Sequence, residues 1–130
     1  MPSAETEELA GKSNHWGLTF CVGTWSEGGD KMGKNVFEMI RDFGGRGKLF
    51  EVHFRNVTSP LPHFVETFPD DGYMDMYQVM KTLREVRFDG AAEPDHVPQL
   101  AGDTGLHRAG TAYCIASMRG MLRRANEEVG

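Results

Sequence analysis

Three residues whose side chains commonly bind divalent metals stand at the ends of three short apolar segments. They are Cys21, His53 and Asp95, and they lie 32 and 42 residues apart. Each spacing is about one strand plus one helix, which predicts that the residues end successive parallel strands. Since such strand ends meet at one rim of a (β/α) barrel, where active sites are built, the three side chains are expected to converge. A thiolate, an imidazole and a carboxylate at one rim predict a divalent metal site.

The elements that would position these residues alternate between strand and helix patterns. A short apolar run predicts a buried strand over residues 16–22, and two further strands are expected over residues 49–54 and 90–93. Helical patterns cover residues 4–12, a segment from Lys34 to Gly44-Gly45, a segment that begins at Asp75, and residues 108–125. Between them we expect a glycine-rich loop at 23–33 and a long, proline-containing functional loop at 58–72. The alternation predicts the α/β class with a parallel sheet in one domain, residues 1–130.

Composition excludes several classes of protein. The formal net charge is −5, and both signs are scattered along the chain without a basic patch, so a nucleic-acid partner is not expected. The sequence contains no apolar run of about 20 residues and no signal peptide, so neither a membrane span nor export is expected. Two cysteines make no disulfide framework, which predicts a cytoplasmic protein. Of these two, Cys114 is predicted to lie within a helix and to pack in the core of the protein.

Four motifs that surround these residues resemble the C-terminal part of D-mannonate dehydratase. They are Gly17–Thr24, Val52–Val57, Asp71–Met76 and Pro94–His96, and their order and spacing match as well. The resemblance extends from about Asn14 to the last helix. It implies a xylose-isomerase-like (β/α)8 TIM barrel that dehydrates D-mannonate to 2-keto-3-deoxy-D-gluconate in hexuronate (glucuronate) catabolism, with Mn²⁺ or Fe²⁺ as cofactor.

The resemblance also implies which residues act. The family's metal ligands match Cys21, His53 and Asp95, together with a histidine from an earlier strand that this sequence does not contain. His96 matches the catalytic acid/base, a task that suits imidazole because its pKa lies near neutral pH. His107 stands where some members carry a tyrosine, and it is either the second catalytic acid or a solvated loop residue.

Every one of these residues also has a simpler interpretation. Cys21 could be a small buried core residue, and His53 could be a histidine of the core. Asp95 could simply belong to a turn, where Asp is common. Arg55 favours the site, because strand alternation places it on the same face as His53, and a buried guanidinium requires an anion. The carboxylate of a sugar acid would supply that anion. Asn56, which comes next, either contacts substrate hydroxyls or caps a turn. Nearby, His63 and Glu66 in the long loop could reach the rim, but both are expected to be solvated loop residues.

Length separates this chain from a whole barrel. A (β/α)8 barrel typically needs about 250 residues, whereas this chain has 130, enough for three or four βα units. The sheet of such a part would have two open edges, so we expect a homo-oligomer or association with a complementary half-barrel. Besides mannonate dehydration, the sequence leaves open another metal-dependent sugar isomerase or epimerase of this barrel class. It also leaves open a truncated, inactive fragment that needs a partner chain.

Overall fold

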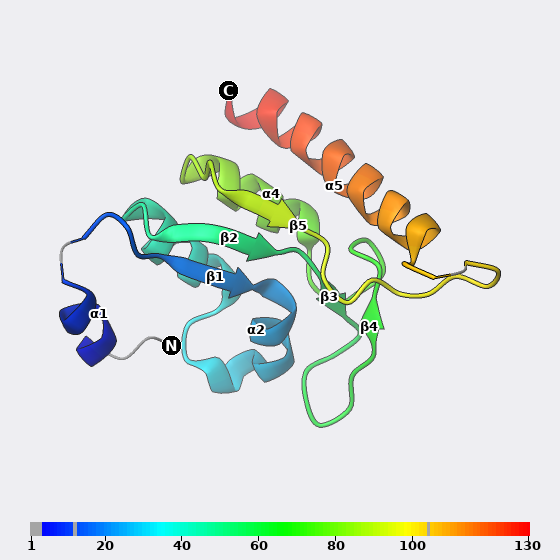
Figure 1. Cartoon of the computed structure of the whole chain (residues 1–130), viewed down its shortest axis with the longest axis horizontal. Coiled ribbons are helices and arrows are strands. Elements are labelled where there is room, and N and C mark those ends of the chain that lie inside the picture. Colours follow the sequence, from blue (N-terminus) through cyan, green and yellow to red (C-terminus); the bar gives the residue numbers. More distant parts are fainter. Residues whose placement is uncertain (1–3, 12, 104) are drawn as a thin grey trace.

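A three-stranded parallel sheet organises the molecule. The computed structural model describes residues 4–11, 13–103 and 105–130. Its sheet has the strand order β1-β2-β5, with β1 at Leu18–Cys21, β2 at Leu49–His53 and β5 at Ala91–Glu93 (Figure 1). Each strand lies inside a segment predicted as a strand. The parallel pairing confirms the α/β class.

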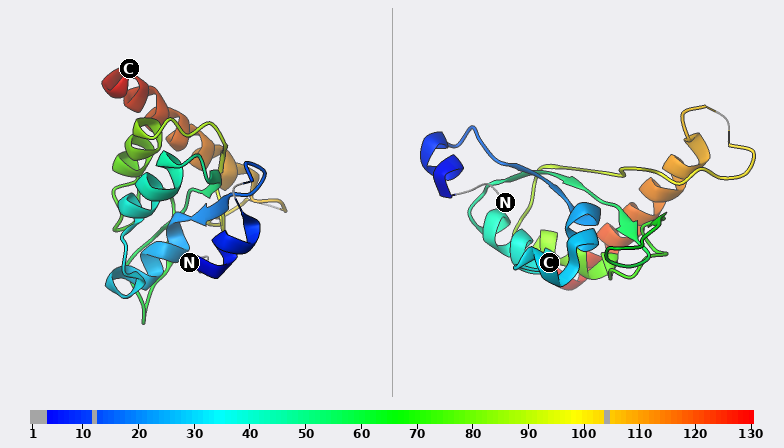
Figure 2. Two further views of the ribbon diagram at one scale, coloured as in Figure 1. Left: turned by 90° about the vertical axis from the view of Figure 1, so that its left-hand side faces the viewer. Right: turned by 90° about the horizontal axis from the view of Figure 1, so that it is seen from below.

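Helices cover one side of this sheet and leave the other side open. In the right panel of Figure 2, α2, α3 and α4 lie beneath the strands. The helices are α1 (Ala4–Ala10), α2 (Val22–Gly28), α3 (Val36–Met39), α4 (Met76–Glu85) and α5 (Arg108–Val129). A 3-10 turn at Gly29–Met32 follows α2, a π-helical turn at Ile40–Gly44 follows α3, and a small antiparallel pair joins β3 (Asn56–Val57) to β4 (Glu66–Thr67).

The core lies between the sheet and these helices. Phe20 on β1, Val52 on β2 and Phe54 directly after β2 point toward the helices and are at most 4% exposed. They pack with apolar side chains that recur at helical spacing on α3, its π-helical extension and α4. The buried set there comprises Val36, Met39, Ile40, Phe43, Met76, Val79, Met80 and Leu83.

The helix ends follow the signals in the sequence. Asn35 caps α3 in a reciprocal capping box with Glu38. The π-helical continuation of α3 ends at Gly44, where a stop was predicted. At the start of α4, the Asp75 side chain accepts a hydrogen bond from the Gln78 amide at 2.9 Å. These caps confirm both predicted helix boundaries to within two residues.

Residues 23–33 form helical turns instead of the predicted glycine-rich loop. The sulfur of Cys21 accepts a hydrogen bond from the Thr24 amide at 3.3 Å, so it serves as the N-cap of α2. Ser26 donates its hydroxyl to the Val22 carbonyl at 2.7 Å. Gly23 is required for packing, because a Cβ there would lie 2.5 Å from Cγ of Arg55. The glycine that indicated a loop therefore admits a close tertiary contact within a helix.

Helix α5 packs chiefly against α4. Cys114 is 2% exposed on its inner side, which confirms the predicted core position. The predicted loop at 58–72 contains the additional strand β4. Lys12, at the end of the first predicted helix, and Thr104 lie outside the described residues. Across the parts of the chain that are described, no helix combines the length and apolarity that a bilayer span requires.

Candidate metal centre

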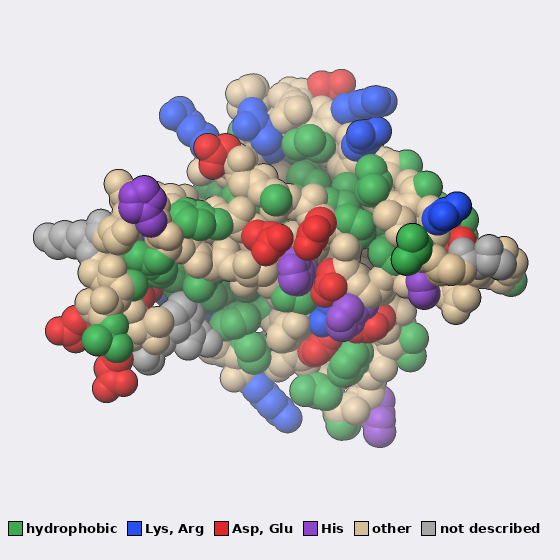
Figure 3. Space-filling view, in the orientation of Figure 1, with side chains coloured by type: hydrophobic (Ala, Val, Ile, Leu, Met, Phe, Trp, Pro, Cys, Tyr) green, Lys and Arg blue, Asp and Glu red, His purple; other side chains and the backbone are tan. Residues whose placement is uncertain are grey.

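The strand register places polar side chains side by side on the open face of the sheet. Cys21 on β1 pairs with His53 on β2, and His53 pairs with Glu93 on β5. One pleat earlier, Thr19 pairs with Glu51. Because side chains alternate along a strand, these five residues share the face that the helices do not cover. Acidic and histidine side chains accordingly gather at the centre of this face (Figure 3).

The three predicted ligands come together at one end of that face. Asp95, two residues beyond β5, brings its Oδ2 to 4.0 Å from Cys21 Sγ and 3.5 Å from His53 Nδ1. One donor atom from each residue lies within 4.8 Å of the others. The expected convergence is confirmed, and all three side chains are half-buried. A sulfur, a nitrogen and an oxygen donor at an open position fit a divalent transition metal with room for further ligands.

The second nitrogen of His53 faces carboxylates as well. Its Nε2 lies 3.6 Å from Glu93 and 4.0 Å from Glu51. Glu51 is held by the Thr19 hydroxyl, which donates to it at 2.8 Å. Metal-binding histidines usually present their other ring nitrogen to such an acceptor, which fixes the orientation of the ring. The arrangement of His53 therefore fits a ligand whose Nδ1 faces Cys21 and Asp95.

Arg55 is buried, as predicted, but the protein itself supplies its anions. Its side chain is 6% exposed, and Nη1 lies 2.6 Å from Glu27 and 3.3 Å from Glu66, while Nε lies 3.3 Å from Asp95. Burial by itself would lower the pKa of Arg55, but the hydrogen bond that it donates to Glu27 and the surrounding negative charge raise it. A substrate carboxylate is thus not needed to neutralise this guanidinium. Arg55 instead fixes Asp95 beside Cys21 and His53.

Glu66 links Arg55 to His96, a connection that the sequence did not indicate. One Glu66 oxygen contacts both Arg55 Nη1 and Nδ1 of His96. The other ring nitrogen of His96 lies 3.8 Å from Asp95 Oδ1. His96 has a left-handed backbone with φ of 46° and a side chain that is 57% exposed. The prediction of a solvated Glu66 was wrong, because the β3–β4 pair turns this residue back toward the site.

The side chain of Asn56 has a structural role. It is fully buried, and its amide donates to the carbonyls of Pro69 and Met74, each at 3.0 Å. Its Oδ1 accepts from the backbone amides of Val57 and Met74. These four hydrogen bonds occupy the amide group completely. The structure therefore supports the turn-capping alternative for Asn56 over contact with substrate hydroxyls.

His107 stands apart from this network. It precedes α5 as its N-cap residue in a left-handed conformation, with φ of 48°. Its Nδ1 is buried, and no described residue provides a hydrogen-bond partner for it. Within the described residues, no hydrogen bond or ion pair joins His107 to Asp95 or His96. The role of His107 as the second catalytic acid stays a prediction.

The chain is similar in sequence to known proteins. The model of the D-mannonate dehydratase (UxuA) family matches residues 6–129. Mannonate dehydratase 2 of Halalkalibacterium halodurans is 33% identical over 95 residues, which cover 71% of this chain and 26% of that protein. The mannonate dehydratase of Thermotoga maritima is 34% identical over 90 residues, covering 67% and 24%. The chain thus spans about a quarter of the length of these curated relatives.

The fold has a solved counterpart. The crystal structure of mannonate dehydratase from Streptococcus suis superposes with a TM-score of 0.78 and 27% sequence identity. The superposition covers 97% of this chain and 37% of that one. Sequence and fold therefore point to the same family. The chain belongs to the D-mannonate dehydratase family.

Proposed function

We propose that this chain provides the metal-binding rim of an enzyme that dehydrates D-mannonate to 2-keto-3-deoxy-D-gluconate in hexuronate catabolism. The convergence of Cys21, His53 and Asp95 beside His96 carries the proposal. These residues come from three separate strand ends, and a purely structural role would not require them to meet. The metal is Mn²⁺ or Fe²⁺, and the enzyme works in the cytoplasm, where reducing conditions keep the Cys21 thiol available.

In this proposal Cys21 Sγ, His53 Nδ1 and an Asp95 oxygen hold the metal. When bound, the metal supplies Lewis-acid polarisation of the substrate oxygens. Arg55 keeps Asp95 in place through its bond to Oδ2, and Glu93 and Glu51 orient the ring of His53. These supporting residues hold the ligands together before the substrate arrives, so the site needs little rearrangement.

His96 takes the proton from C2 of the substrate. In this role His96 donates Nδ1–H to the Glu66 carboxylate, which leaves the lone pair on Nε2. Nε2 is also the nitrogen nearer to Asp95 and hence to the metal side of the site. Loss of the C2 proton and of the C3 hydroxyl gives an enol, which converts to the 2-keto product. His107 donates the proton with which the C3 hydroxyl leaves as water.

The active enzyme is a TIM barrel in which this chain forms part of the wall. The three strands of the sheet would be consecutive members of that barrel, with the open polar face turned toward its interior. Barrel interiors and rims receive residues from all eight strands, so the remaining strands would complete the substrate site. Turnover is expected only when the complementary part of the barrel is present.

The test uses the chain together with the part of the Streptococcus suis enzyme that it does not match. Addition of D-mannonate and Mn²⁺ should yield 2-keto-3-deoxy-D-gluconate, measured as the 2-keto acid. The His96→Asn variant should lose turnover by about a hundredfold or more while it still binds Mn²⁺, because the change removes a base and no ligand. Undiminished turnover in this variant would overturn the assignment of the base.

A further inference from the structure

We propose that Glu27, on α2, is a positioning residue of the candidate metal centre. Its carboxylate neutralises the buried guanidinium of Arg55, so that Asp95 keeps its negative charge for a bound cation. The inference rests on the proposed function, because it concerns the same metal. Glu27 lies outside the four motifs that carry the family resemblance, the first of which ends at Thr24.

One face of α2 is built around Arg55. Cys21, Thr24 and Glu27 follow one another at intervals of three residues, a spacing that places side chains on the same side of a helix. Cys21 caps this helix, and Thr24 Oγ1 accepts a hydrogen bond from Arg55 Nη2 at 3.1 Å. Gly23 leaves the room that the guanidinium requires. The helix that begins at the predicted thiolate ligand therefore also carries the groups that bind Arg55.

Of the carboxylates around Arg55 in the described chain, Glu27 lies closest. Its Oε1 is 2.6 Å from Nη1, whereas Glu66 and Asp95 each approach the guanidinium to 3.3 Å. The side chains of Glu27 and Arg55 are both largely shielded from water. The Leu61 amide donates to the Glu27 carbonyl at 2.8 Å, which fixes this turn of α2 against the long loop. A short hydrogen bond between two charged groups is a strong one, so α2 anchors the guanidinium.

The charges of this cluster explain why that contact matters to a cation. A divalent metal at the three predicted ligands would lie beside the positive charge of Arg55, which opposes its binding. A guanidinium without Glu27 would also be free to turn further toward Asp95, which it already contacts through Nε. With Glu27 in place, the pair of Glu27 and Arg55 carries no net charge. The negative charge and an oxygen of Asp95 therefore remain available to the metal.

The same neutralisation concerns the partner of His96. One Glu66 oxygen lies 3.3 Å from Nη1 of Arg55 and also contacts Nδ1 of His96. Glu27 is the nearer acceptor for Nη1, so Glu66 can serve the imidazole. Loss of the Glu27 carboxylate would make Glu66 the nearest carboxylate to Nη1 and draw it away from His96. Glu27 thus supports both the predicted ligand and the proposed base, although it contacts neither.

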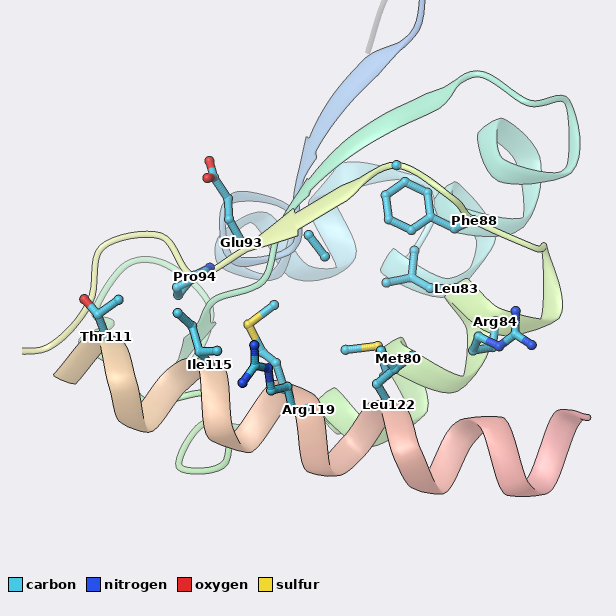
Figure 4. A pocket seen from close by; sticks show the side chains of 13 residues that line it. Met80, Leu83, Arg84, Phe88, Glu93, Pro94, Thr111, Ile115, Arg119 and Leu122 are labelled. Atoms are coloured by element: carbon cyan, nitrogen blue, oxygen red, sulfur yellow. The ribbon is translucent and has the colours of Figure 1, made fainter. Parts of the chain in front are cut away.

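An apolar cavity of about 620 Å³ between β5, α4 and α5 lies apart from this cluster. In Figure 4 the Glu93 carboxylate projects to one side of β5, while Ile115 and Leu122 of α5 lie on the other. Glu93 shares the open face of the sheet with its strand partner His53, so the cavity lies on the side away from the predicted metal. Arg119, an exposed residue that lines the cavity, is therefore a suitable place for a control change of charge.

The experiment measures Co²⁺ binding by the 130-residue chain through the sulfur-to-metal absorption band. Glu27→Gln should weaken Co²⁺ binding by about tenfold, the size of effect expected when a residue that supports a ligand is lost. The band itself should persist at saturating Co²⁺, because the ligands are unchanged. Glu27→Asp keeps the charge and should recover most of the affinity. Thermal melting of the metal-free variants shows whether each one folds.

Two controls separate the position of the charge from its amount. Asp30→Asn removes a carboxylate from an exposed position three residues further along the chain. Arg119→Gln changes the net charge at the distant cavity. Both should bind Co²⁺ as the unmodified chain does, because exposed charges beyond about 10 Å are largely screened at 0.1 M salt.

Each result decides between the possibilities. Unchanged Co²⁺ affinity in Glu27→Gln, or an equal loss in Asp30→Asn, would overturn the role of Glu27 and leave the proposed function standing. A loss that Glu27→Asp does not recover, with melting temperatures lowered in both variants, would assign Glu27 to the folding of α2 alone. Absence of the band in the unmodified chain would contradict the proposed metal site and this inference with it. If Glu27 behaves as expected but the completed barrel fails to dehydrate D-mannonate, the proposed function alone is contradicted.

Discussion

The two faces of the sheet are built from the same short strands, yet they differ in nearly every physical property. On the helix side, Phe20 and Val52 are at most 4% exposed and pack in the core. On the other side, the neighbouring residues Cys21, His53 and Glu93 are half-buried or exposed and carry polar groups. The covered face provides the stability of the chain, while the open face holds the groups that can bind a metal. Stability and chemistry can therefore be altered separately.

The largest effect is expected on the covered face. Phe54→Ala removes a fully buried aromatic side chain and should lower the free energy of unfolding by about 3–5 kcal/mol. Glu51→Ala on the open face of the same strand is the control and should change it by about 0.5 kcal/mol or less. Urea denaturation followed by circular dichroism measures both. An equal loss of unfolding free energy in the two variants would show that stability does not come mainly from the covered face.

A second change tests the open face for its metal. Cys21→Ser should abolish the sulfur-to-metal absorption band of the Co²⁺-loaded chain and weaken Co²⁺ binding by about tenfold or more. Serine is a good N-cap, so the hydrogen bond to the Thr24 amide and the stability of α2 should persist. Cys114→Ser, in the core, should leave the absorption band unchanged. An intact band in Cys21→Ser would exclude this thiol as a ligand.

The smallest effect concerns the outer surface of the helices. Glu128 on α5 pairs with Lys81 of α4 and with Arg124. The Tyr77 hydroxyl beside it, together with the hydrogen bonds that Lys81 and Arg124 donate, lowers the pKa of Glu128 to about 2. A carboxyl pKa that is lower in the folded state stabilises the fold above its unfolded value of about 4.3, and this contribution disappears as the pH falls toward 2. Glu128→Gln should therefore slightly lower the melting temperature at pH 7, and this difference should shrink as the pH falls through about 2.

The control for that change is Glu127→Gln, which alters the neighbouring exposed residue. Its melting temperature should follow that of the unmodified chain through the same pH range. If both variants behaved alike, the ion pairs between α4 and α5 would contribute nothing specific. In that case the packing of α5 in the core, on the helix side of the sheet, would be what holds this helix in place.

Much of this protein follows from its sequence alone. The three strands, the caps at Asn35 and Asp75 and the approximate bounds of α4 and α5 depend on residues within a few positions of one another, which periodicity and capping rules describe. The convergence of Cys21, His53 and Asp95 also followed from their spacing, because parallel strands deliver their ends to one rim.

Tertiary structure alone decided what surrounds these three residues. Glu66 meets Arg55 and His96 only because β4 pairs with β3, and nothing in its loop has a period that indicates this contact. Asn56 is enclosed by backbone groups from residues 13 and 18 positions away. Gly23 indicated a loop, whereas it lies within α2 and leaves room for the side chain of Arg55. Local patterns determine elements, but the partners of a buried polar group are set by the chain segments that the topology brings beside it.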